Sequence, residues 1–191
     1  MHSLAKIISV VFHPILLSVL TFSLLVLSGG GVTRRSLLIL GLCILFVDVL
    51  PLLYVYQMKR KKLTSHWDIP ERLQRNNPLL FSVFLYTLGF VLLILLNANL
   101  PVKVLMFAYM LNTSVIWLIT RYWKISIHGA SYGGSVATLA AVLSPVFYWL
   151  VALLPLLLFA RVQTKSHTPM QVLIGFTVMF LLTSIQFEVA T

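Results

Sequence analysis

The sequence predicts an all-α integral membrane protein with about seven transmembrane helices, and two observations carry this prediction. Hydrophobic residues make up 60% of the 191 residues, whereas charged residues make up only 9%. Soluble domains carry about 25% charged residues, so this chain has too few polar groups to cover a globular surface. The apolar residues are also gathered into long runs, as membrane-spanning helices of about 20 residues require.

Five apolar runs fall within the length range of a spanning helix, roughly 17–25 residues. They are 7–27, 37–56, 79–98, 104–122 and 170–187. Two shorter runs, 129–144 and 146–160, are separated by Pro145, and we expect them to form a tight helical hairpin in the protein interior. The sequence therefore predicts six to seven spans in a single polytopic domain over 1–191.

The connections carry most of the charge. The stretch 57–78 is the only long hydrophilic segment, and the net charge of +10 comes mainly from such breaks. In a soluble chain this charge would suggest a nucleic-acid partner. Between apolar runs it instead follows the positive-inside rule and favours contacts with anionic lipids. With seven spans, the N-terminus, the 57–78 loop and the breaks at 122–128 and 161–169 share one face, which we expect to be cytoplasmic.

The chain offers little for redox or metal chemistry. Its single cysteine, Cys43, lies inside an apolar run, which excludes a disulfide framework and a thiolate metal site. Only four acidic residues are present, and they form no carboxylate cluster in the sequence. We therefore expect no cofactor and no metal, and we expect membrane lipids, rather than nucleic acid, as partners. The sequence does not set the oligomeric state.

Three polar segments interrupt the apolar sequence and are predicted to meet on the same face: 68–75, 124–128 and 161–171. Together they supply several cations and two histidines. Arginine matches phosphate oxygens with its planar fork of donors. One histidine can attack phosphorus, and a second can protonate the leaving alkoxide. This combination favours a site for a phosphate or pyrophosphate group at a membrane face.

Two of these segments resemble signatures of a known family. Arg161-x5-His167 resembles the third signature of the type 2 phosphatidic acid phosphatase (PAP2) superfamily, Ser-Arg-x5-His-x3-Asp. Ser126-Ile127-His128 resembles the second signature, Pro-Ser-Gly-His. The segment with Arg72 and Arg75 takes the place of the first signature, Lys-x6-Arg-Pro. The resemblance covers roughly residues 45–190 and is to a divergent bacterial branch of the superfamily, with a PAP2-like helical bundle.

The resemblance implies a lipid or isoprenoid phosphate phosphatase of the bacterial inner (plasma) membrane that needs no metal and acts through a phosphohistidine. His167 would be the nucleophile and His128 the general acid. The groups that would hold phosphate oxygens are Arg161, Arg72, Arg75, Lys124 and Ser126.

The chain departs from the family pattern at the residue that would orient the nucleophile. Gln171 stands where the family has an aspartate, one helical turn beyond His167. A neutral amide can accept a hydrogen bond from the imidazole N–H and fix its tautomer. Asp48 is the one acid inside an apolar run, and an intramembrane carboxylate is a functional-site hypothesis by default. We expect it either to pair with His13 or to reach the site and replace the missing aspartate.

Two other functions stay open at this stage. A binding or transport protein could keep the cationic pocket without hydrolysis, which the neutral Gln171 and the loss of a glycine at Ile127 motivate. A structural assembly subunit is the third alternative, motivated by the small-residue helix face around Gly129 and Gly133. Each site residue also has a structural interpretation: a helix N-cap for Ser126, and interfacial or surface charges for the arginines.

Overall fold

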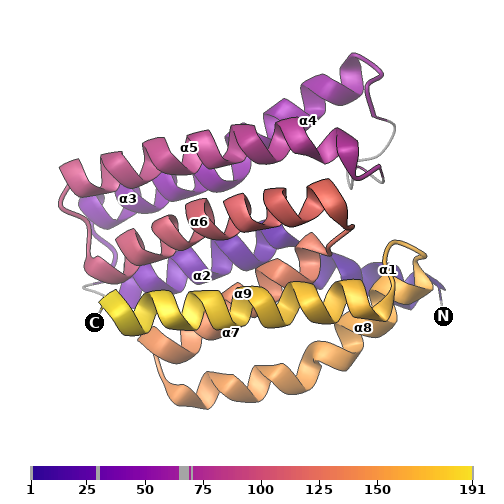
Figure 1. Ribbon diagram of the computed structural model, residues 1–191. Helices are drawn as coiled ribbons and strands as arrows, with labels where there is room; N and C mark the ends of the chain where they lie inside the picture. The colour runs from indigo at the N-terminus through magenta and orange to yellow at the C-terminus, as the bar shows by residue number, and fades with distance from the viewer. Residues whose placement is uncertain (1, 29–30, 65–68, 70, 191) are drawn as a thin grey trace. The chain divides into compact units, whose positions relative to one another are not determined.

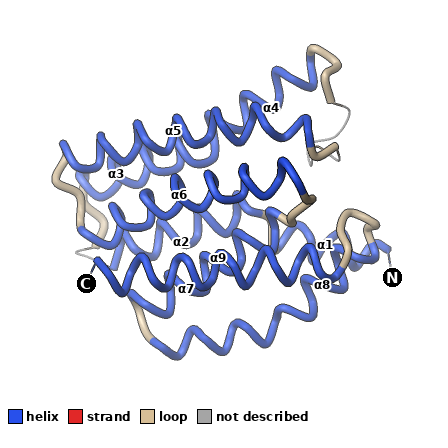
Figure 2. The backbone as a smooth tube through the Cα atoms, in the orientation of Figure 1, coloured by secondary structure: helices blue, strands red, loops and turns tan. Residues whose placement is uncertain are grey.

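The computed structural model describes residues 2–28, 31–64, 69 and 71–190, and every regular element among them is a helix (Figure 2). Among these residues, six helices are long and apolar enough to cross a membrane, which confirms the predicted class of all-α integral membrane protein. Where the sequence predicts a single domain, the contacts divide the chain into two compact units. The first unit contains residues 1–21 and 125–191, and the second contains residues 22–124.

The first unit is built from the two ends of the chain (Figure 1). Its elements are α1 (His2–Val11), the first half of α2 (Pro14–Ser28), α7 (Ile127–Val142), the 3-10 helix η3 (Pro145–Leu153), α8 (Leu154–Gln163) and α9 (Pro169–Ala190). Pro14, Pro145 and Pro169 each open an element, as expected for a residue that has no amide hydrogen to lose in a first helical turn. The apolar run 7–27 consequently contains a break at His13 between α1 and α2.

Helices α7 and α9 pack closely and in parallel. A Cβ atom on Gly129 would lie 2.5 Å from the carbonyl oxygen of Val172, and one on Gly133 would overlap the carbonyl oxygen of Phe176. The same sequence offset at both glycines shows that the two helices start at the same end of the unit. The small-residue face of α7 is therefore covered by α9 of the same chain, and it is not a surface for another subunit.

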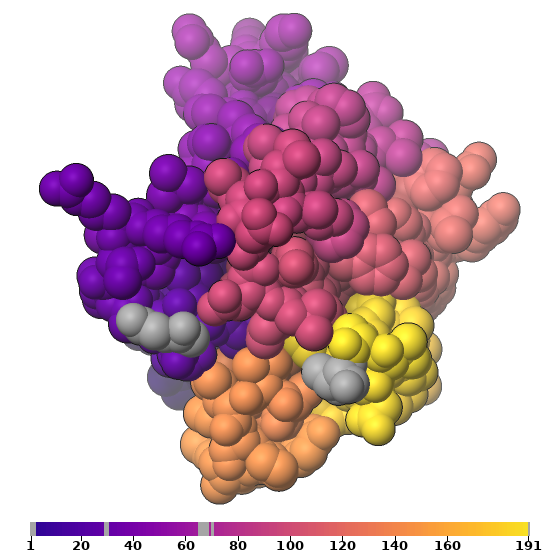
Figure 3. All heavy atoms as spheres, turned by 90° about the vertical axis from the view of Figure 1, so that its left-hand side faces the viewer, coloured from indigo at the N-terminus to yellow at the C-terminus, as the bar shows by residue number. Residues whose placement is uncertain are grey.

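The predicted interior hairpin is correct for α7 and wrong for its partner. Helix α7 has 16 residues and buries most of them, but η3 and α8 together run from Pro145 to Gln163, long enough to span the membrane. Bulky apolar side chains of this stretch point outward, among them Val146, Tyr148 and Trp149. Figure 3 shows the orange start of this stretch beside the yellow end of α9. Further along α9, the ring of Tyr148 packs on the ring of Phe180. The reason for the difference is side-chain size, because only the Gly- and Ala-rich helix fits between neighbours.

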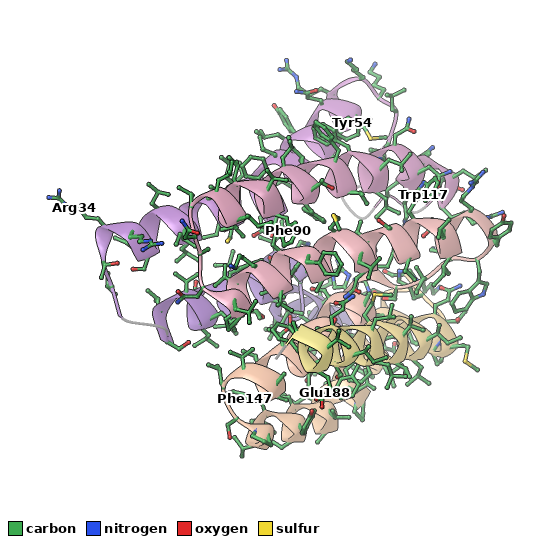
Figure 4. The ribbon with its side chains drawn as sticks, turned by 60° about the vertical axis from the view of Figure 1, so that its left-hand side comes forward. Arg34, Tyr54, Phe90, Trp117, Phe147 and Glu188 are labelled. Carbon is green, nitrogen blue, oxygen red and sulfur yellow. The ribbon has the colours of Figure 1, made fainter. Side chains whose placement is uncertain are left out.

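The second unit contains the remaining spans. Its elements are the second half of α2, α3 (Arg34–Ile44), the π-helical turn η1 (Leu45–Val49), α4 (Leu50–Arg60), the 3-10 turn η2 (Leu73–Arg75), α5 (Asn76–Leu95) and α6 (Leu100–Tyr122). Helices α5 and α6 lie side by side, and α3, η1 and α4 form one long apolar span that contacts α5 (Figure 1). Figure 4 labels Tyr54 of α4, which stacks on Phe81 of α5.

Arginine side chains cap helices at both ends of this second unit. Arg35 donates hydrogen bonds to the carbonyl oxygens of Leu96 and Asn97, each over 2.9 Å, just after α5 ends. Arg72 donates to the carbonyl oxygens of Thr120 and Arg121, in the last turn of α6. These carbonyls have no partner within their helix, and a cation at a helix C-terminus also complements the helix dipole.

The close approach of α7 and α9 predicts the effect of a single methyl group. Gly133→Ala should lower the free energy of unfolding by about 1–3 kcal/mol, because the new Cβ meets backbone atoms that cannot move aside. Gly41→Ala is the matched control: a Cβ there meets nothing within 4 Å, and alanine favours the helix by up to about 1 kcal/mol. Thermal unfolding of the two variants in detergent measures the difference. Equal unfolding temperatures would contradict the parallel packing.

Candidate functional site

The loop between α8 and α9 fixes the spacing of Arg161 and His167. Helix α8 ends at Gln163, and the carbonyl oxygen of Arg161 accepts hydrogen bonds from the amides of Ser166 (3.1 Å) and His167 (3.3 Å). Lys165 adopts a left-handed backbone with φ of 53°, the conformation that closes a Schellman motif. One carbonyl thus holds both ends of the Arg-x5-His pattern, so its spacing is set by a helix C-cap.

The His167 ring is held by Gln171 in one tautomer. Its Nδ1 lies 2.9 Å from Gln171 Oε1, and the amide of Thr168 donates to the same oxygen over 3.3 Å. An amide oxygen only accepts hydrogen bonds, so the network assigns the proton to Nδ1 of His167. In the neutral ring the other nitrogen, Nε2, then carries a lone pair. Gln171 therefore makes the contact that the sequence predicts for it.

Residues 126–128 lie beside the start of α9. The amide of Ser126 donates to the carbonyl oxygen of Gln171 over 3.1 Å, and Gly175 approaches the carbonyl oxygen of Ser126. The Ser126 hydroxyl is fully buried and accepts a hydrogen bond from the Gly129 amide, which makes it the N-cap of α7. The helix-cap interpretation of Ser126 is therefore correct, while its contact to phosphate stays a prediction.

His128 and Arg161 contact each other inside the unit. The Arg161 NH1 atom lies 3.4 Å from Nε2 of His128, and both residues are only 4% exposed. A guanidinium only donates hydrogen bonds, so Nε2 of His128 is the acceptor and its proton is on Nδ1. The structure thus joins the two signature-like segments through the side chains that the resemblance singles out.

The electrostatics around these residues favour an anion. The parallel helices α7 and α9 begin side by side, and each N-terminus carries a partial positive charge of about half an elementary charge. Arg161 adds a full charge, and His167 is also buried. The one acid in the sequence of this unit is Glu188, at the other end of α9, roughly 25 Å along the helix from Gln171 (Figure 4). Phosphate suits such a site, because it accepts hydrogen bonds from amides, imidazoles and guanidinium alike.

Four predicted site residues belong to the second unit. Arg72 caps α6, and Arg75 is buried and donates from Nε to the carbonyl oxygen of Ile69 over 2.7 Å. These contacts give both arginines a structural role in their own unit. Asp68 and Pro70, from the same sequence segment, lie outside the described residues.

Asp48 and Lys124 are the other two. Asp48 is buried in η1, next to Val47, whose carbonyl oxygen accepts a hydrogen bond from the Tyr86 hydroxyl over 3.5 Å. A π-helical turn inside an α-helix is often found at functional positions. Lys124 is half-buried in the connection that follows α6.

One residue near the site has a role that the sequence did not indicate. The His13 ring packs edge-to-face on the ring of His128, with the centroids 5.4 Å apart. The sequence predicted for His13 only a pairing with Asp48. The available signal was the His-Pro pair in the middle of an apolar run, which places a histidine at a helix break.

The first unit therefore brings together five of the predicted residues: Ser126, His128, Arg161, His167 and Gln171. Within the described part of the chain, no three His, Cys, Asp or Glu side chains are grouped as metal ligands. No family model, curated protein or solved structure matches the chain.

Proposed function

We propose that the protein is a membrane-embedded phosphatase for lipid or isoprenoid phosphates that acts through a phosphohistidine on His167. The observation that carries the proposal is the hydrogen bond from His167 Nδ1 to Gln171, which leaves Nε2 as a lone-pair donor. The buried His128–Arg161 pair at the neighbouring helix start supports it by supplying a phosphate ligand and an acid. The PAP2 resemblance of both segments adds the reaction type.

The proposed reaction has two displacements at phosphorus. Nε2 of His167 forms a bond to phosphorus while the bond from phosphorus to the lipid oxygen breaks, and the leaving oxygen takes a proton from His128. Water then attacks the phosphohistidine, His128 takes up a proton from it, and inorganic phosphate leaves with His167 restored. When phosphate binds, Arg161 donates to the phosphate oxygens in place of Nε2 of His128. That nitrogen can then hold the proton that His128 gives to the leaving oxygen.

The position of the site along α9 favours a lipid-borne substrate. Helix α9 has 22 residues and is about 33 Å long, close to the 30 Å thickness of a bilayer core. Its first turn, with Gln171, therefore lies near the depth of the lipid headgroups. The positive-inside rule favours the cytoplasmic face of the bacterial plasma membrane for this end. A phosphate carried on a lipid or prenyl chain would be presented there.

The first test removes the two histidines separately. His167→Ala should abolish phosphate release from a prenyl phosphate and from phosphatidic acid, because the nucleophile is gone. His128→Ala should slow release by about 10²–10⁴-fold, the usual contribution of a general acid. Gln163→Ala is the control and should leave the rate unchanged, because Gln163 is an exposed residue at the end of α8. Full activity in both histidine variants, at unchanged unfolding temperature, would refute the mechanism.

The second test concerns the residue that holds the nucleophile. Gln171→Glu should raise kcat, by roughly tenfold, because a carboxylate stabilises the positive charge that the ring gains as Nε2 of His167 bonds to phosphorus. Gln171→Leu should lower kcat, since Nδ1 of His167 then loses its acceptor. Initial rates of phosphate release at saturating prenyl phosphate measure both changes. If the glutamate and leucine variants have the same rate, Gln171 does not act on His167.

The neutral Gln171 favours a second candidate, a lipid-phosphate binding or transport protein that uses the same site without hydrolysis. In that case His167→Ala should leave binding unchanged. Arg161→Leu should weaken it by about tenfold or more, because a charge-assisted hydrogen bond is lost. The rise in unfolding temperature of the protein in detergent on addition of phosphatidic acid, compared with the same lipid without its phosphate, measures binding. Turnover by the wild-type protein would exclude this candidate.

A further inference from the structure

The break between α1 and α2 places two aromatic rings on α7. Phe12 packs edge-to-face on Tyr132, with centroids 4.8 Å apart and planes at 87°. His13 packs in the same way on His128, at 5.4 Å and 88°. His128 and Tyr132 are one helical turn apart, so the two neighbouring residues of the break contact two neighbouring positions on one face of α7.

The His13 side chain also serves as the N-cap of α2. Its Nδ1 accepts a hydrogen bond from the Ile15 amide over 3.3 Å, and its carbonyl oxygen accepts from the Leu17 amide. Serine, aspartate and asparagine are the residues usually found in this role. Because Nδ1 accepts, its proton is on Nε2 and the ring is neutral. The cap alone does not require an imidazole, whereas the contact with His128 requires a flat ring.

We propose that His13 is a positioning residue that holds the His128 imidazole with Nε2 toward Arg161. The edge-to-face contact with His13 blocks rotation of the His128 ring from one side. Arg161 donates to Nε2 of His128, and this hydrogen bond fixes which ring nitrogen is the acceptor. The helix that begins at Pro14 fixes the backbone from which His13 projects. A neutral His13 adds no positive charge that would oppose protonation of His128. His13 acts through His128, so the functional part of this role rests on the proposed phosphatase activity.

The test uses two pairs of variants that change the ring while the cap stays constant. His13→Asn keeps a capping acceptor and removes the ring, for comparison with the wild type. His13→Phe and His13→Leu both lack the acceptor, and only phenylalanine keeps a flat ring. Phe12→Leu removes the neighbouring ring contact and leaves His13 in place, which makes it the control for docking of the break.

The readout is the tautomer of His128, measured by ¹⁵N NMR of histidine-labelled full-length protein in lipid bilayers. The wild type, His13→Phe and Phe12→Leu should show His128 as a single neutral tautomer, with the proton on Nδ1 and an unprotonated Nε2. His13→Asn and His13→Leu should show both tautomers. A mixture in the wild type would overturn the proposal, and so would a single tautomer in His13→Leu. The phenylalanine and leucine pair decides the question if His13→Asn does not fold.

Kinetics with a prenyl phosphate separate positioning from binding. The variants without a ring should lose about 10- to 100-fold in kcat, the order of loss expected for a misplaced catalytic group, while KM stays within about twofold. A fall in kcat of the same size in Phe12→Leu would assign the effect to docking of the break and overturn the role of His13. If even the wild type releases no phosphate, the proposed function fails, and the tautomer comparison still decides what His13 does.

Discussion

The site depends on how closely α7 and α9 approach each other. Gly129 and Gly133 bring α7 against the backbone of Val172 and Phe176, and Gly175 does the same in the other direction at Ser126. Because the helices are parallel, this packing puts two helix N-termini together at one end of the unit. Two positive helix ends repel each other, so the arrangement is favourable where an anion is bound between or beside them.

The intervening segment returns the chain to that end and completes the site. Helix α7 ends at Val142, and η3 and α8 run back as one lipid-facing span that ends at Arg161 and Gln163. The Schellman turn after α8 then leads into α9, and His167 just before this helix is hydrogen-bonded to Gln171 in its first turn. The chain therefore passes through α7, returns through η3 and α8, and passes again through α9. This path brings His128, Arg161 and His167 into one unit although they are separated in the sequence.

Sequence spacing alone could predict some of the relative positions of the site residues and not others. Arg161 and His167 are linked by local hydrogen bonds of a helix cap, so their relation follows from six consecutive residues. His128 meets Arg161 only because of tertiary packing, and the resemblance to a family was the one guide to that pairing. His13 had no such guide, because its ring contact joins residues from the two ends of the chain. For Arg72 and Arg75 sequence spacing left two roles open, since a cationic side chain near a helix end can also satisfy main-chain carbonyls.

By itself the sequence determined that the protein is an all-α membrane protein, where five of its spans lie and which polar breaks interrupt them. Apolar runs and prolines act locally, and the cost of placing polar backbone in hydrocarbon leaves few alternatives to helices. The tertiary structure alone decided that the chain forms two compact units and that α8 faces outward. It also decided which histidine nitrogens carry protons, since a tautomer is set by partners such as Gln171 and Arg161 that only folding brings within hydrogen-bond distance.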